Sequence, residues 1–492
     1  MAAIIRIDHC RTLTEATLSG WFFGFGYFLA GLWWIGAAFL VEARYQWAMP
    51  FAVIGLPLIL ALFYALAFGL CFRFWRSGLH RIILFSLLMT ATELLRASLF
   101  TGFPWNALGM LLGTELVFAQ ITSVIGLYGL TFFVVLLGSL PVLLFTEQAR
   151  SRRALGPLLS LIGLMALYGF GHQRLDSASA DFVPNTRIRI MQPSIAQDEK
   201  FDQANSANIL SLYLSLSSKG SYPSPHGMEG ITHLIWPETA FPFLLDQSPK
   251  AREEIARILP KGAVLLTGAV RAEQGSAQSG RDYFNSIQML DDSGVIKASA
   301  DKVHLVPFGE YLPLSGALDF FGLRDFITAP GGFIPGAQRD PLLVPAWPPA
   351  LPLICYEAIF PDESRLTNGK RAGVLLNVTN DAWFGFTPGP SQHYAQARLR
   401  AIEYGAPLIR AGNNGISAII DPYGREIARI DLGARGIIDG PLPAALPKTP
   451  YARLSDGPFS PWSLFMGLIG ILFTIGQITP RRAVSIRATS DR

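Results

Sequence analysis

Long apolar runs dominate the first 170 residues of the chain and recur close to its C-terminus. A run of roughly 17–25 apolar residues is long enough to cross a lipid bilayer as a helix. Such runs lie near positions 19–41, 51–72, 82–99, 120–145, 154–171 and 461–479. The third run contains Glu93 and Arg96, which share one face of a helix and are expected to pair inside a bundle. The pattern predicts a transmembrane helical domain over 1–172, a C-terminal transmembrane helix over 458–480 and a cytoplasmic tail over 481–492.

Between the fifth and the sixth apolar run the pattern changes, and short strands alternate with turns and amphipathic stretches. Strands are predicted at 187–192, 232–236, 263–268, 285–290, 294–298, 351–355, 373–378, 407–411 and 416–420. The residues Asp291-Asp292-Ser293 predict a tight turn between two of these strands, and the apolar spacing over 391–404 predicts a helix. Strands that alternate with helices predict a layered α/β domain over 183–450.

Composition and charge place this α/β domain relative to the membrane. Half of the 492 residues are hydrophobic, only 15% are charged, and the mean hydropathy is +0.34, which is typical of a partly membrane-embedded chain. The net charge of +4 is too small to indicate nucleic-acid binding. Arginines gather on one side of the spans, at Arg6, Arg11, Arg73, Arg76, Arg81, Arg150, Arg152, Arg153, Arg481, Arg482, Arg487 and Arg492. The opposite short loops hold only Arg44 and Arg96, so the positive-inside rule predicts cytoplasmic termini and an α/β domain in the periplasm, outside the bacterial inner membrane.

The chain has three cysteines, Cys10, Cys71 and Cys355, and only the last belongs to the α/β domain. The predicted topology puts the other two near the cytoplasmic face, where neither reaches Cys355. A lone thiol in an oxidising compartment has no disulfide partner within its domain. Because Cys355 also follows a short apolar strand and precedes a helix-like turn, we interpret it as a nucleophile.

Two further motifs supply the groups that such a thiol needs. Glu238 stands just past a predicted strand, and Lys302 precedes a Pro/Gly-rich turn that is followed by Glu310. A carboxylate can take the thiol proton, and a lysine with backbone N–H groups can stabilise an oxyanion. Each signal is weak alone, but the order Glu, Lys, Cys at strand ends is specific.

The chain has no Gly-x-Ser-x-Gly elbow, paired-histidine metal motif or phosphate-binding glycine loop, so we expect no metal and no cofactor. Structural or hydrogen-bonding roles are expected for the separated histidines His233, His304 and His393.

The order and sequence of these motifs resemble the nitrilase superfamily of carbon–nitrogen hydrolases, whose Glu-Lys-Cys triad lies on an α-β-β-α sandwich. The membrane spans narrow the resemblance to one branch, the apolipoprotein N-acyltransferase family. The matching stretches are 26–34, 100–106, 302–313, Cys355-Tyr356-Glu357, 377–385, 389–393 and 400–403. That family has eight membrane helices against the six counted here, so the resemblance implies a chain that is shortened at its N-terminus and lacks the first two.

The resemblance also implies a mechanism. Cys355 is the expected nucleophile, Glu238 the general base and acid, and Lys302 the oxyanion stabiliser. Supporting roles are implied for Glu310, which orients or charge-balances Lys302, for Tyr356, which shapes the acyl site, and for Glu357, beside the thiol. The implied reaction moves an acyl chain from a phospholipid to the N-terminal α-amine of a diacylglyceryl-cysteine apolipoprotein through a Cys thioester with ping-pong kinetics, as the final step of bacterial lipoprotein maturation. The implied partners are this phospholipid donor, this apolipoprotein acceptor and the membrane, with a monomeric enzyme.

Apolar side chains outside the spans are candidates for contact with lipid. We single out Trp236, Phe321, Trp383 and Phe384, for each of which an ordinary place in the core is the alternative. Two other functions stay open. A membrane-tethered amide or nitrile hydrolase would use the same triad with water as the acceptor, and a lipoprotein carrier or sensor would need no triad at all.

Overall fold

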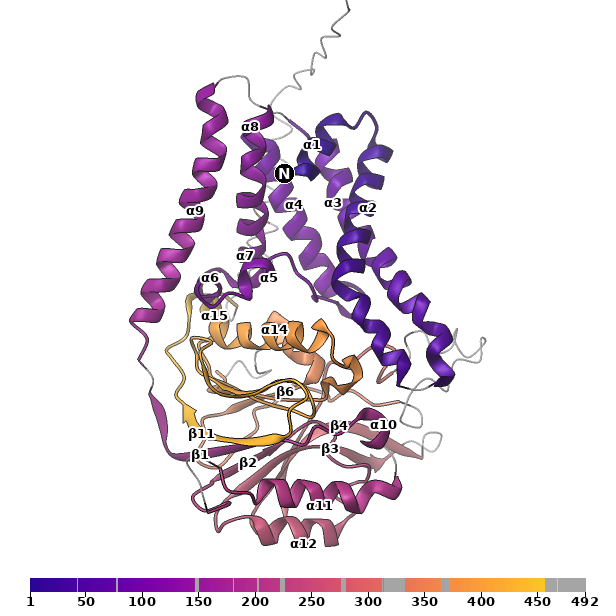
Figure 1. Ribbon diagram of the computed structural model, residues 1–492, viewed down its shortest axis with the longest axis vertical. Coiled ribbons are helices and arrows are strands. Elements are labelled where there is room, and N and C mark those ends of the chain that lie inside the picture. Colours follow the sequence, from indigo (N-terminus) through magenta and orange to yellow (C-terminus); the bar gives the residue numbers. More distant parts are fainter. Residues whose placement is uncertain are drawn as a thin grey trace, which may run out of the picture.

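The computed structural model describes residues 1–455, apart from 42, 77, 147–149, 180, 201–202, 222–225, 276–279, 312, 314–331, 364–365 and 367–370, together with Gly467. A helical bundle and an α/β domain are stacked along the long axis of the molecule (Figure 1). The N-terminus lies near the end of the bundle that is remote from the α/β domain. Phe321 lies outside the described residues, and so do the predicted C-terminal helix and tail apart from Gly467.

Within the part of the chain that the structure describes, the bundle contains five helical segments that are long and apolar enough to cross a membrane. They are Leu13–Leu40, Gln46–Arg73, Leu79–Thr101, Thr122–Thr146 and Arg153–Asp176, which confirms the first five predicted spans. The α-helices described in the membrane domain are α1 (Ala2–His9), α2 (Leu13–Leu32), α3 (Leu56–Arg73), α4 (Leu79–Ser98), α5 (Met110–Gly113), α6 (Leu116–Ala119), α7 (Thr122–Ser139), α8 (Leu143–Thr146) and α9 (Arg150–Asp176), of which α1, α5 and α6 lie outside the five spans. In α3, Ile59, Leu62 and Leu66 share one exposed face, as expected for side chains that meet lipid rather than other helices.

An ion pair inside α4 holds the bundle to the loop that follows this helix. Arg96 Nη2 lies 2.5 Å from Glu93 Oε2, and both side chains are buried, which confirms the predicted pair. Tyr64 on α3 donates its hydroxyl to the other oxygen of Glu93 at 2.5 Å. Arg96 also donates to the backbone carbonyls of Phe103 and Trp105. A buried charge costs several kcal/mol unless it is paired in this way, so the pair fixes the path of the loop toward the α/β domain.

The described residues of the α/β domain form two sheets of mixed direction. The strands are β1 (Phe182–Gln192), β2 (His233–Trp236), β3 (Val264–Gln274), β4 (Arg281–Leu290), β5 (Ile296–Asp301), β6 (Ala350–Ile354), β7 (Val374–Thr379), β8 (Leu408–Gly412), β9 (Ser417–Ile420), β10 (Glu426–Ile430) and β11 (Gly436–Pro443). One sheet has the order β11-β1-β2-β3-β4-β5 and the other β10-β9-β8-β7-β6. The first nine strands were predicted from the sequence, whereas β10 and β11 were not.

Helices cover the outer face of each sheet. They are α11 (Ser206–Ser217) and α12 (Pro249–Ile258) on the six-stranded sheet and α14 (Pro388–Tyr404) on the five-stranded sheet. The short helix α10 (Gln197–Lys200) precedes α11 in the chain, and α15 (Pro450–Ser455) packs against α7 and α14. Successive residues of a strand point to opposite faces, so Val264 and Leu266 of β3 enter the core between the sheets while Leu265 packs toward α11 and α12. In β6, Ile354 likewise faces the other sheet and Leu353 packs toward α14. The layers are therefore α-β-β-α, which confirms the expected fold.

Helix α14 joins the two parts of the molecule, because it lies between the five-stranded sheet and the bundle (Figure 1). Gln392 accepts hydrogen bonds from the indole nitrogens of Trp34 at 3.1 Å and Trp105 at 2.8 Å, both from the membrane domain. At the other end of α14, Glu403 accepts a 2.7 Å bond from the backbone N–H of Leu127. These bonds hold the edge of the α/β domain that carries Cys355 against the bundle.

Candidate active site

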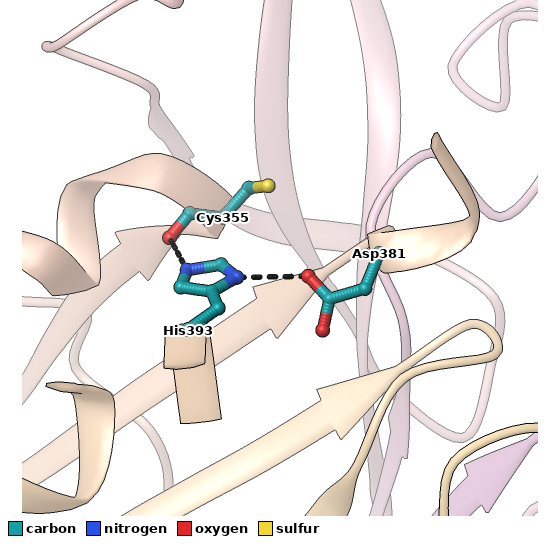
Figure 2. A group of neighbouring side chains, drawn as sticks. All are labelled: Cys355, Asp381 and His393. Atoms are coloured by element: carbon teal, nitrogen blue, oxygen red, sulfur yellow. Dashed lines mark hydrogen bonds and ion pairs between the residues drawn. The ribbon is translucent and has the colours of Figure 1, made fainter. Parts of the chain in front are cut away.

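Cys355 occupies a strained elbow directly after β6. Its φ is +51°, a left-handed conformation that residues other than glycine rarely adopt and that is concentrated at functional sites. Two side chains hold the backbone on either side of it. Glu357 Oε2 accepts a 2.7 Å bond from the N–H of Ile354, and His393 Nε2 lies 3.0 Å from the carbonyl oxygen of Cys355 (Figure 2). The elbow presents the thiol at the end of the strand.

Glu238 lies in the turn after β2, and both of its carboxylate oxygens are held. Oε1 accepts a 2.8 Å bond from Asn285 Nδ2, and Oε2 accepts a 2.8 Å bond from the backbone N–H of Asn380. Gly268 makes room for this turn, because a Cβ there would lie 2.4 Å from the Cα of Glu238. The carboxylate is therefore buried in one orientation, with hydrogen bonds from both sheets.

Lys302 follows β5 and lies between two acids. Its Nζ is 2.8 Å from Glu310 Oε2 and 3.7 Å from Glu238 Oε1. Asn285 links the same two acids, since its Nδ2 also donates to Glu310 Oε1 at 2.8 Å. Burial lowers the pKa of Lys302, but Glu310, Glu238 and Cys355 more than compensate and hold that pKa above its ordinary value. The lysine therefore stays an ammonium group at neutral pH.

The thiol of Cys355 is neutral in the resting site. Burial raises its pKa above the ordinary range, and the carboxylate of Glu238 raises it further, while Lys302 and a hydrogen bond with Thr379 oppose the shift. The thiol thus experiences both the Glu238 and Lys302 charges, so the structure brings together the three residues that were predicted to act together. A proton must leave this thiol before it can attack. Two buried carboxylates act on it, and Asp381 is already paired with Arg410 and His393, so Glu238 is the candidate base.

The three supporting residues lie around this group, and Glu310 contacts Lys302 as described above. Glu357 lies under the elbow, where its Oε1 accepts backbone N–H bonds from Val303 at 2.8 Å and His304 at 3.0 Å, and a bond from Arg339. It therefore ties the nucleophile to the segment that carries Lys302. Tyr356 points to the membrane domain and donates its hydroxyl to the carbonyl of Gly102 at 3.2 Å.

Trp236 lies away from this cluster. It is fully buried in the core between the six-stranded sheet and its covering helices, and its indole nitrogen donates to Ser217 at 2.9 Å. Its ring packs edge-on against Tyr213 and Phe241. The structure therefore gives Trp236 the alternative role of a core residue. Its sequence neighbour Glu238 reaches the site because the chain turns sharply between them.

The aromatic turn η11 (Asp381–Phe384) lies at the joint with the bundle. Phe384 packs edge-on against Trp34 at 4.7 Å and Trp105 at 5.9 Å between ring centroids. Trp383 is half-buried on the same turn. Both residues thus lie on the side of the domain that faces the membrane helices, while Phe321 lies outside the described residues.

A polar network under the elbow was not expected from the sequence. His393 Nδ1 lies 2.8 Å from Asp381 Oδ1 (Figure 2), and Arg410 donates to Asp381 Oδ2 at 2.8 Å. Burial raises the pKa of Asp381, but Arg410 and His393 lower that pKa to about 2. Ligand atoms of Cys355, Asp381 and His393 lie within 4.8 Å of one another, a grouping that could hold a metal ion. However, protein partners occupy both ring nitrogens and both carboxylate oxygens, which fits a support for the elbow.

Sequence reasoning therefore missed several groups that complete the site. They are Lys200, Asn285, Arg339, Asn380, Asp381 and Arg410. Asn380 and Asp381 lie in the stretch 377–385, which resembles the family, and Asn285 opens a predicted strand, so these three carry a weak signal. The sequence predicts a structural or hydrogen-bonding role for His393, and its bonds agree with that prediction. Lys200 carried no signal, because nothing in its neighbourhood indicated burial.

Comparisons with known proteins cover both parts of the chain. Residues 1–140 match the family model of the apolipoprotein N-acyltransferase N-terminal domain, and residues 210–448 match the carbon–nitrogen hydrolase model. The chain is 47% identical over 453 residues to an apolipoprotein N-acyltransferase of Rhodopseudomonas palustris and 45% identical to one of Bradyrhizobium diazoefficiens, with 91% of this chain and 84% of each relative covered. Among solved structures it is similar to an amidase from Nesterenkonia, at 21% identity over 54% of this chain and 94% of that chain, with a TM-score of 0.38.

Proposed function

The chain belongs to the apolipoprotein N-acyltransferase family, which performs the final step of lipoprotein maturation, and from that premise we propose that Cys355 carries the acyl group in this transfer. The observation that carries the proposal is the arrangement of Glu238, Lys302 and Cys355 at one end of the two sheets, beside the membrane domain. A covalent carrier splits an acyl exchange between two lipids into two easier steps.

In the first step Glu238 takes the proton of the Cys355 thiol, and the sulfur attacks the carbonyl carbon of a phospholipid ester. The ammonium group of Lys302 stabilises the oxyanion of the tetrahedral intermediate. Because Lys302 is already paired with Glu310, its position is set before the substrate arrives. The ester C–O bond then breaks, Glu238 returns its proton to the leaving glycerol oxygen, and a thioester and a lysophospholipid result.

In the second step the N-terminal α-amine of the apolipoprotein attacks the thioester carbon. Glu238 now takes a proton from the amine, and Lys302 again faces the oxyanion. The C–S bond breaks, the proton passes to the sulfur, and the thiol is restored with an amide on the acceptor. An amine attacks a thioester readily, and exclusion of water by the packed joint with the bundle favours this outcome over hydrolysis.

Exposed aromatic side chains support a lipid donor over a small soluble amide. Phe308, in the turn between Lys302 and Glu310, is 63% exposed, and Phe386, just after η11, is 78% exposed. Both belong to segments that carry or flank the site. Large apolar side chains left in water are unfavourable, so their exposure is expected where they meet acyl chains. Together with five membrane-length helices, they favour a substrate that stays in the bilayer.

We also propose that the α/β domain lies in the periplasm and the termini in the cytoplasm. The arginine bias of the short loops supports this orientation, and the N-terminus lies at the opposite end of the bundle from the α/β domain (Figure 1). We expect a cysteine introduced at the exposed Lys250, in a Cys355→Ala background, to react with a membrane-impermeant maleimide in intact spheroplasts. Cys10 is expected to react only after permeabilisation, and the reverse pattern of labelling would invert the orientation.

The function is tested most directly with purified enzyme in detergent micelles. Phosphatidylethanolamine alone is expected to acylate Cys355, with one lysophospholipid released per thioester formed, and the peptide that contains Cys355 can be identified by mass spectrometry. Added diacylglyceryl lipopeptide is then expected to accept the acyl chain, with the parallel double-reciprocal plots of ping-pong kinetics. Steady release of free fatty acid without N-acylated product would instead favour the membrane-tethered hydrolase.

A further inference from the structure

Lys200 is a buried cation that the mechanism above does not use. It is the last residue of α10, its side chain is fully buried, and its Nζ donates a 2.9 Å hydrogen bond to the backbone carbonyl of Glu238. Lysine is almost never fully buried, because removing an ammonium group from water is costly unless it is paired. Among the described residues, the hydrogen bond found for Nζ is the one to this carbonyl.

The charges of the site explain why a second cation is useful. Glu238 and Glu310 contribute two carboxylates, whereas Lys302 contributes one ammonium group between them. Without a further cation this buried group has a net negative charge, which opposes both a thiolate and an oxyanion. The ammonium of Lys200 makes the sum zero. Like charges repel strongly at these distances in a low-dielectric interior, so this difference acts directly on the negatively charged transition states.

Lys200 also lies where it can position the general base. The turn at Glu238 is strained, since Thr239 has a φ of +47°, and Lys200 bonds to the carbonyl between these two residues. The same short helix holds the other side of the carboxylate. Gln197 accepts a 2.7 Å bond from the side chain of Asn380, whose backbone N–H in turn donates to Glu238.

On this basis, and resting on the function proposed above, we infer that Lys200 is a positioning residue that holds the Glu238 turn and supplies the second positive charge that thioester formation at Cys355 requires. Lys200 acts by holding Glu238 and through the electrostatic field of its ammonium group, without contact with the substrate.

Because the role of Lys200 depends on its charge, the rate of thioester formation is expected to change with pH as Lys200 loses its proton. Burial lowers the pKa of Lys200 to about 8, although Glu238 and Cys355 oppose the shift. These two are the titratable groups that face it, from the turn after β2 and from the elbow after β6, while Lys302 and Glu310 reach the same carboxylate from the β5 side. Lys200 is therefore charged below about pH 8 and neutral above it, so the charge that the inference requires disappears as the pH rises through this value.

The test measures single-turnover formation of the Cys355 thioester with phosphatidylethanolamine between pH 6 and 9, without acceptor. The wild-type rate is expected to decline above about pH 8. Lys200→Met is expected to be slower by on the order of tenfold to hundredfold at pH 7, less than the loss of a direct oxyanion donor, and to lack this decline. Lys200→Arg keeps its charge throughout the range, so it is expected to recover much of the rate and also to lack the decline. Lys261→Met, at an exposed lysine of the same domain, is the matched control and is expected to behave like the wild type.

Failure of the inference differs from failure of the proposed function. If the wild type forms no thioester on Cys355, the proposed function fails. If the wild type is acylated but Lys200→Met has its rate and pH profile, the inference is overturned. Thermal unfolding in detergent shows whether Lys200→Met folds. If Lys200→Met does not fold, the pH profile of Lys200→Arg decides. A rate of thioester formation by Lys200→Arg that still declines above about pH 8 overturns the inference, and a rate that no longer declines supports it.

Discussion

A Cys355→Ala variant is expected to form no acyl-enzyme and to lose apolipoprotein acylation by at least about 10³-fold, because every proposed step passes through the sulfur. The neutral thiol sits next to Glu238 and Lys302, and neither of these can replace it as an acyl carrier. The measurement follows lysophospholipid release and N-acylated lipopeptide with purified enzyme. Both products are expected to disappear together, since the first step supplies the intermediate for the second.

Two further variants make this result specific. Cys355→Ser keeps a nucleophile of similar size but a hydroxyl is harder to deprotonate, so it is expected to accumulate little or no acyl-enzyme. Cys10→Ala alters a thiol at the other end of the bundle and is expected to keep wild-type activity. Unchanged transfer by Cys355→Ala would rule out the thioester route and leave Glu238 and Lys302 without a nucleophile to activate.

Glu238→Gln is expected to slow thioester formation by roughly 10²–10⁴-fold, the range that a positioned general base contributes. Glutamine has nearly the same shape, but it cannot take the proton of Cys355. Both oxygens of Glu238 accept hydrogen bonds, one from Asn285 Nδ2 and one from the N–H of Asn380. The NH2 group of the glutamine would therefore face one of these donors and lose a hydrogen bond. The measurement is the single-turnover rate of acylation of Cys355 by phosphatidylethanolamine.

Alkylation of Cys355 by iodoacetamide gives an independent check on the same variant. Because the Glu238 carboxylate raises the pKa of the Cys355 thiol, its removal is expected to leave alkylation at high pH at least as fast as in the wild type, which shows that the thiol is intact while its acylation is slow. Glu229→Gln changes an exposed carboxylate of the same domain and is expected to have no effect. Acylation at the wild-type rate by Glu238→Gln would show that another group takes the thiol proton.

The parts of the fold that the sequence predicted correctly are those whose signal is local. A membrane span is visible because its whole surface must be apolar, and Glu93 with Arg96 is an exception that the i,i+3 spacing explains. Strands such as β3 and β6 are visible because a short apolar run is a property of one segment. In contrast, β10 is short and mostly exposed, and β11 contains glycine and proline, so their pairing with β9 and β1 supplies the stability that their own residues lack.

The residues of the site likewise fall into those that the sequence predicts and those that only the tertiary structure shows. The sequence by itself determined the family, the membrane character and the order of Glu238, Lys302 and Cys355, because these motifs are short and lie at strand ends. Only the tertiary structure decided that Lys200 is a buried partner of Glu238, that His393 supports the elbow and that Trp236 is a core residue. The physical reason is that a buried polar group must be satisfied by partners from other elements, and these partners are chosen by packing across two sheets, which no local pattern of residues records.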